Sequence, residues 1–162
     1  MQQKIMPCLW YDHEAEEAVQ FYTSLFEDSR IVETVPSPEV GPGEPGTTML
    51  VVFELAGQRY MALNGGPEFT FNEAVSLNIA CESQEEIDRL WERLGEGGEY
   101  GPCGWLKDKY GLSWQVDSAE LQQMFNDPDQ DKVNRVMRAM LEMSKIDIAR
   151  LREAAESPAV TG

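Results

Sequence analysis

The sequence predicts an α+β protein made of two similar halves, followed by a group of C-terminal helices. Apolar residues recur at strand and helix spacing in the same order in both halves. An offset of 69 residues aligns Phe21-Tyr22 with Leu90-Trp91, which favours an internal duplication. The chain has 162 residues, 42% of them hydrophobic, enough for one globular domain or two small modules with a shared core. This composition excludes a disordered chain.

The first half is expected over residues 1–67. Residues 4–11 are short and apolar, which predicts a strand, and a helix over 14–26 follows with one buried face. Ala56-Gly57-Gln58 is typical of the turn of a hairpin. The remaining strands of this half are predicted over residues 30–35, 47–55 and 59–63.

The second half is expected over residues 68–117 and repeats this order. Residues 74–81 alternate as a strand does. Ser83 and Glu86 then form a capping-box pattern, which predicts that a helix begins there. The last strands are predicted over residues 99–107 and 112–117.

Residues 118–156 are predicted to form a helical appendage, followed by a frayed tail over 157–162. Asp127 before Pro128 predicts the start of one helix, because proline is tolerated at the first helical position. Ser144 and Asp147 form a second capping-box pattern, which predicts the start of another helix.

The charge distribution excludes some classes of partner. The net charge is −16, of which residues 1–117 carry 7 basic and 21 acidic groups, whereas residues 118–162 carry 6 and 8. Nucleic acids and anionic membranes require a basic face, so we expect neither as a partner. The absence of a signal-like start and the three widely spaced cysteines indicate a cytoplasmic protein with reduced thiols.

Four stretches of the sequence carry a resemblance to a known family. They cover residues 9–31, 53–76, 101–116 and 132–151, and include LNGGP and GPCGWLKDKYGLSWQ. The chain resembles the PhnB-like, or 3-demethylubiquinone-9 3-methyltransferase-like, group of the vicinal-oxygen-chelate superfamily, which also contains glyoxalases, bleomycin-resistance proteins and extradiol dioxygenases. The resemblance implies two βαβββ modules whose strands curl into a cleft. It also implies a homodimer, often with modules or strands exchanged between chains.

The resemblance further implies a divalent metal held by imidazole and carboxylate ligands on facing strands. Alignment to the Phe21-Tyr22 pair places non-ligating residues at these positions, namely Pro7, Met61 or Ala62, Ser76 and Gln115. The sole histidine, His13, is expected on the turn between strand and helix, where a solvated side chain is the alternative to a ligand. We therefore predict no catalytic metal and no cofactor.

No sequence motif in this chain supports the methyltransferase description of the group. S-adenosylmethionine enzymes commonly carry a glycine-rich turn after a strand. Here Gly95–Gly98 follows a predicted helix instead.

The cleft is instead predicted to bind an unidentified small organic molecule, because aromatic and amide side chains suit such a ligand. Core packing is the alternative for Trp10 and Trp114, and a turn role is the alternative for Asn64. Lys107 and Asp108 either pair at the cleft mouth or belong to a solvated turn. The candidate cleft residues are Trp10, Asn64, Ser76, Trp105, Ser113 and Gln115.

Three functions remain open at this point. The first is a dimeric, metal-independent protein that binds a small molecule. The second is a glyoxalase-type or resistance-type enzyme of the same fold, whose metal site is either misaligned in the alignment above or completed across a dimer. The third is a scaffold that binds a protein partner through its C-terminal helices.

Overall fold

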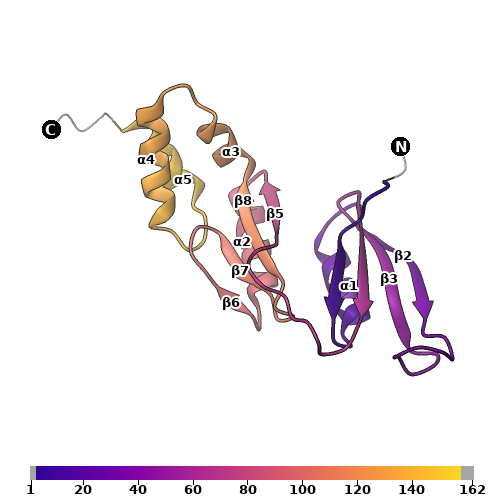
Figure 1. Cartoon of the computed structure of the whole chain (residues 1–162). Coiled ribbons are helices and arrows are strands. Elements are labelled where there is room, and N and C mark those ends of the chain that lie inside the picture. Colours follow the sequence, from indigo (N-terminus) through magenta and orange to yellow (C-terminus); the bar gives the residue numbers. More distant parts are fainter. Residues whose placement is uncertain (1–2, 158–162) are drawn as a thin grey trace. The chain divides into compact units, whose positions relative to one another are not determined.

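The computed structural model describes residues 3–157 and divides the chain into two compact units, one ending at Phe71 and the other beginning at Asn72 (Figure 1). Each unit contains one four-stranded mixed sheet. The C-terminal helices belong to the second unit. Within residues 3–157, no helix is long and apolar enough to cross a membrane.

The sheet of the first unit has the strand order β1-β4-β3-β2. β1 pairs with β4 in parallel, and the other pairs are antiparallel. The turn at Ala56 and Gly57 joins β3 to β4 as predicted, with φ angles of 46° and 77°. Both values suit the tight turns that hairpins prefer. The elements are β1 (Cys8–Tyr11), α1 (Ala15–Leu25), β2 (Arg30–Pro36), β3 (Thr48–Leu55) and β4 (Gln58–Asn64).

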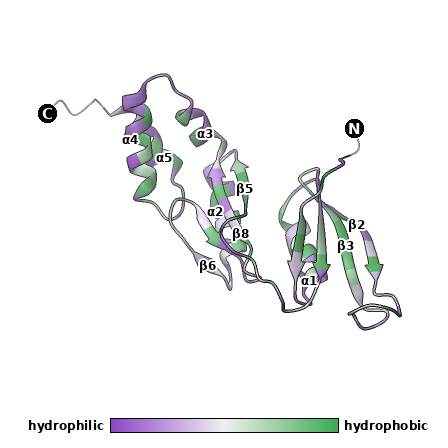
Figure 2. Ribbon diagram, in the orientation of Figure 1, coloured by the Kyte–Doolittle hydropathy of each residue, from purple (hydrophilic) through white to green (hydrophobic). Residues whose placement is uncertain are grey.

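Helix α1 packs on one face of this sheet. Val19 and Tyr22 of the helix are fully buried, as are Val51 and Phe53 of β3. Most of β3 is hydrophobic (Figure 2). Because side chains alternate along a strand, only one side of each strand faces α1.

The second unit repeats the first, since its sheet has the equivalent strand order β5-β8-β7-β6. The prediction of two βαβββ modules with C-terminal helices is therefore confirmed. Ser83 caps α2 as predicted, because its hydroxyl accepts a hydrogen bond from the Glu86 N–H. The elements are β5 (Ser76–Cys81), α2 (Gln84–Gly95), β6 (Glu99–Tyr100), β7 (Trp105–Lys107) and β8 (Ser113–Ser118).

Asp108 lies in the turn before β8, for which two alternatives were predicted, an ion pair with Lys107 and a solvated turn. It does not pair with Lys107 and is not solvated, because only 2% of its surface is exposed. Its carboxylate accepts hydrogen bonds from the backbone N–H groups of Tyr110 and Leu112 and from the Trp114 indole, at 2.9, 3.1 and 2.8 Å. Trp114 is likewise buried, so core packing is its role.

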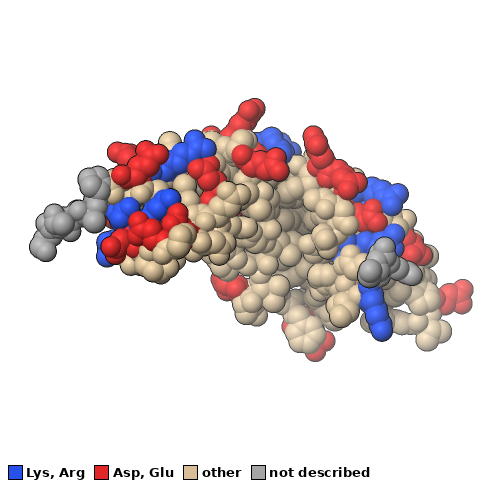
Figure 3. Space-filling model, turned by 90° about the horizontal axis from the view of Figure 1, so that it is seen from above, with Lys and Arg blue, Asp and Glu red and all other residues tan. Residues whose placement is uncertain are grey.

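The C-terminal helices are α3 (Ala119–Phe125), α4 (Gln130–Leu141) and α5 (Ile148–Glu156). Two predicted helix starts were wrong. Helix α4 is capped by Asp129 rather than begun at Asp127, and α5 is capped by Asp147 without Ser144 as its box partner. Acidic and basic side chains intermingle over these helices (Figure 3). The predicted tail beyond Ser157 lies outside the described residues.

Candidate functional site

Four of the six predicted cleft residues lie on one face of the second sheet, opposite α2. Ser76 on β5 pairs with Ser113 on β8, and Trp105 on β7 pairs with Gln115 on β8. Paired residues share a face, whereas Trp114 between Ser113 and Gln115 points into the core. We call this surface, which also carries Lys107, the cleft face.

A hydrogen bond orders the polar side chains of the cleft face. The Gln115 Nε2 group donates to the Ser76 hydroxyl over 2.9 Å, and so joins β8 to β5. Ser113 behaves differently, although only 1% of its surface is exposed. Its Oγ is the one buried side-chain N or O atom among residues 3–157 that has no hydrogen-bond partner. An unsatisfied buried hydroxyl costs about 1–3 kcal/mol, so such an atom marks a place for a ligand or a bound water.

Ser113 lines a cavity of about 370 Å³, which we call the Ser113 cavity. This volume falls within the range of about 300–1,000 Å³ found for small-molecule sites. The walls are mainly apolar and aromatic, with few polar groups. The lining residues are Glu73, Glu99, Tyr100, Gly101, Pro102, Trp105, Leu106, Lys107 and Ser113.

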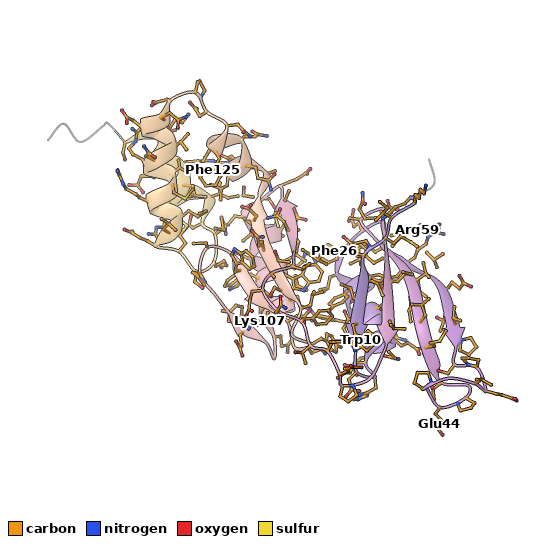
Figure 4. The ribbon with its side chains drawn as sticks, in the orientation of Figure 1. Trp10, Phe26, Glu44, Arg59, Lys107 and Phe125 are labelled. Carbon is orange, nitrogen blue, oxygen red and sulfur yellow. The ribbon has the colours of Figure 1, made fainter. Side chains whose placement is uncertain are left out.

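An ion pair between Lys107 and Glu73 borders this cavity. Lys107 lies on β7 (Figure 4). The hydrogen bond to Glu73 is the main cause that raises the Lys107 pKa, and the charges of Glu73 and Glu99 add to it. The same hydrogen bond lowers the Glu73 pKa. Sequence reasoning missed Glu73 and Glu99, because no motif marks either residue as a partner of a lysine.

The ion pair predicts a defined pH dependence. The pair's contribution to stability is present above the ordinary glutamate pKa of 4.5 and is lost as the pH falls through the lowered pKa of Glu73. It is also present below the ordinary lysine pKa of 10.5 and is lost as the pH rises through the raised pKa of Lys107. A carbon-13 NMR titration should show the Glu73 carboxyl titrating below 4.5. Titration of Glu73 at or above 4.5 would contradict the pair.

Trp10 and Asn64 lie in the first unit, where their side chains form hydrogen bonds with the backbone. The Trp10 indole donates to the Gly66 carbonyl over 2.8 Å. The Asn64 amide accepts from the Ala15 N–H and donates to the Thr48 carbonyl, both over 2.9 Å. Asn64 is the last residue of β4, and its side chain links the start of α1 to β3.

The donor groups do not fit the divalent metal that the resemblance implies. Within residues 3–157, no three His, Cys, Asp or Glu side chains converge. On the cleft face, two positions at which the resemblance implies metal ligands hold a hydroxyl group (Ser76) and an amide group (Gln115). His13 is highly exposed and lies beside Asp12. Burial raises the pKa of the Cys81 thiol to about 12, which keeps this sulfur protonated.

The two similar modules agree with the vicinal-oxygen-chelate fold that the resemblance implies. The family model for 3-demethylubiquinone-9 3-methyltransferase matches residues 3–117. The chain belongs to this PhnB-like family. A PhnB protein from Bacillus cereus is 42% identical, with a TM-score of 0.63, and the match covers 70% of this chain and 97% of that one.

Two further solved structures share the fold at lower identity. A protein from Pseudomonas aeruginosa is 22% identical, with a TM-score of 0.58, over 70% of this chain and 95% of that one. The fosfomycin resistance protein FosX from Listeria monocytogenes, solved with Mn(II) and dihydroxypropylphosphonic acid, is 13% identical with a TM-score of 0.52. That match covers 76% of this chain and 99% of FosX. A search of curated proteins found no significant match.

Proposed function

We propose that this chain is a metal-independent protein that binds a small organic molecule in the Ser113 cavity. The observation that carries this proposal is Ser113, which lines a cavity of ligand size and whose buried hydroxyl has no hydrogen-bond partner among residues 3–157. A bound molecule with one polar atom would satisfy this hydroxyl once the Ser113 side chain rotates toward the cavity. Gln115 and Ser76 lie on the same face but are not among the residues that line this cavity.

The walls and charges of the cavity indicate the chemistry of the ligand. Trp105 and Tyr100 provide aromatic surface, which suits a flat molecule. One ammonium group (Lys107) and two carboxylates (Glu73 and Glu99) leave the rim with an excess of one negative charge. The whole chain carries −16, so an anionic ligand meets repulsion at long range as well. We therefore propose a neutral or cationic planar molecule.

The donor set supports metal independence, because a hard or borderline divalent ion needs several converging carboxylate, imidazole or thiolate groups. Methyl transfer, which the family description names, gains no support from these residues. Gly95 is the last residue of α2, so Gly95–Gly98 continues from a helix rather than a strand, and the glycine-rich turn of common methyl-donor sites is not formed there.

We also propose that the protein is a homodimer in the cytoplasm, as the resemblance implies. The face of the first sheet opposite α1 carries Leu50, Val52 and Leu63, which stay partly exposed. A second copy that covers this face would bury apolar surface. Analytical ultracentrifugation tests this, because a monomer at micromolar concentration would contradict it.

Two fluorescent probes with the same aromatic skeleton test the ligand chemistry. N-phenyl-1-naphthylamine is neutral, whereas 8-anilino-1-naphthalenesulfonate carries an added sulfonate. We expect the neutral probe to bind about tenfold more tightly, because the sulfonate faces the acidic rim. A Trp105→Ala variant should lose binding of the neutral probe. Tighter binding of the sulfonate, or binding that survives this substitution, would contradict the proposed site.

A further inference from the structure

We infer that the C-terminal helices hold one wall of the Ser113 cavity in place, and that Ser144 is the positioning residue of this contact. The inference rests on the proposed function, because it concerns the same cavity. The family model matches residues 3–117, and α3, α4 and α5 all follow that matched range.

The contact joins the connection between α4 and α5 to the turn before β7. The Cys103 N–H donates to the Met143 carbonyl over 2.8 Å, and the Gly104 N–H donates to the Ser144 carbonyl over 2.7 Å. The Ser144 hydroxyl donates back to the Gly101 carbonyl over 2.7 Å. Three hydrogen bonds thus attach two residues of the C-terminal segment to a single turn.

This turn has a conformation that needs support from its surroundings. Cys103 has a φ of 56° and Gly104 a φ of 81°, both in the left-handed region. A Cβ at position 104 would lie 2.7 Å from the Val116 carbonyl oxygen and 3.0 Å from a side-chain carbon of Ile146. The turn is therefore packed between β8 and the C-terminal segment. Backbone in such regions persists where neighbouring structure fixes it.

The same turn forms a wall of the cavity. Gly101 and Pro102 line the cavity directly. The Gly101 N–H donates to the Trp105 carbonyl over 2.8 Å, and the Trp105 N–H donates to the Pro102 carbonyl over 3.0 Å. A shift of the turn would therefore move the backbone of Trp105, and with it the aromatic surface that faces the ligand.

The C-terminal segment is itself fixed to α2, so it offers a rigid support. The Gln84 side chain donates to the Ile146 carbonyl over 3.0 Å and accepts from the Ile148 N–H over 2.9 Å. Lys145 forms an ion pair of 2.6 Å with Asp88. Ile146 is fully buried. These contacts fix the chain directly after Ser144.

Three variants of the full chain test the inference. Ser144→Ala removes the hydrogen bond to Gly101, Ser144→Thr keeps a hydroxyl, and Asp147→Ala removes the cap of α5 without touching the turn. We expect Ser144→Ala to raise the Kd for N-phenyl-1-naphthylamine about fivefold, as the loss of one hydrogen bond predicts. Ser144→Thr should restore the affinity, and Asp147→Ala should leave it unchanged.

Two readouts do not depend on any ligand. Amide exchange at Cys103 and Gly104 should accelerate in Ser144→Ala only. In protein labelled with 5-fluorotryptophan, the fluorine resonance of Trp105 should shift in this variant, while those of Trp10, Trp91 and Trp114 stay in place. If the wild-type protein does not bind the probe, the proposed function fails, and these two readouts still decide the inference. Unchanged exchange and an unchanged Trp105 resonance, or equal effects of Asp147→Ala, would overturn it.

Discussion

Replacement of Ser113 by alanine is expected to make the protein more stable while weakening its binding of a ligand. The hydroxyl is buried without a hydrogen-bond partner among residues 3–157, so its removal should raise the free energy of unfolding by about 1 kcal/mol. A bound molecule uses the same hydroxyl, and its loss should raise the Kd for N-phenyl-1-naphthylamine about fivefold. Urea denaturation and probe titration measure the two effects separately.

Ser118→Ala is the matched control for this substitution. Ser118 lies on the same strand and has the same exposure of 1%. Its hydroxyl, however, accepts hydrogen bonds from the N–H groups of Glu120 and Leu121 at the start of α3. Loss of this cap should cost about 1 kcal/mol and leave probe binding unchanged. If Ser113→Ala destabilised the protein as much as Ser118→Ala, the Ser113 hydroxyl would have a partner and the proposal would lose its main support.

The second large effect is expected at Asp108. Asp108→Ala removes the acceptor of three hydrogen bonds, which are donated by the N–H groups of Tyr110 and Leu112 and by the buried indole of Trp114. We expect the free energy of unfolding to fall by about 3–5 kcal/mol, because each orphaned donor costs about 1–3 kcal/mol and the losses overlap. Urea denaturation followed by circular dichroism measures this loss.

Asp108→Asn provides a milder variant if the alanine protein does not fold. The amide oxygen of asparagine can still accept from Tyr110 and Leu112, but its NH₂ group would face the Trp114 indole donor. We expect a loss of about 1–2 kcal/mol and a change in tryptophan fluorescence. A loss below about 1 kcal/mol in Asp108→Ala would show that this carboxylate does not hold the turn.

Local sequence patterns were sufficient to predict the two modules and part of the cleft face. The alternation of apolar residues predicted both halves. Ser113 and Gln115 were both named as cleft residues from the sequence, and the strand register places them on one face. The Ser83 cap was also predictable, because this contact spans only three residues.

Contacts between distant residues were not predictable in the same way. The ion pair of Lys107 with Glu73 depends on how the chain before β5 passes over the sheet, and no local pattern encodes this path. The predicted start of α4 was wrong for a local reason. The Asp127 carboxylate accepts from the Asp129 N–H over 2.9 Å, so the chain makes one more turn around Pro128 before the helix begins.

Native mass spectrometry of the untagged protein tests the central claim of a metal-independent binding cavity most directly. The protein, purified without chelator, is incubated in parallel samples with N-phenyl-1-naphthylamine and with Mn²⁺, and its native mass is compared with its denatured mass. We predict one organic molecule per chain, lost on denaturation, and no stoichiometric manganese. One retained metal ion per chain without bound probe would contradict the account and favour a metal-dependent enzyme.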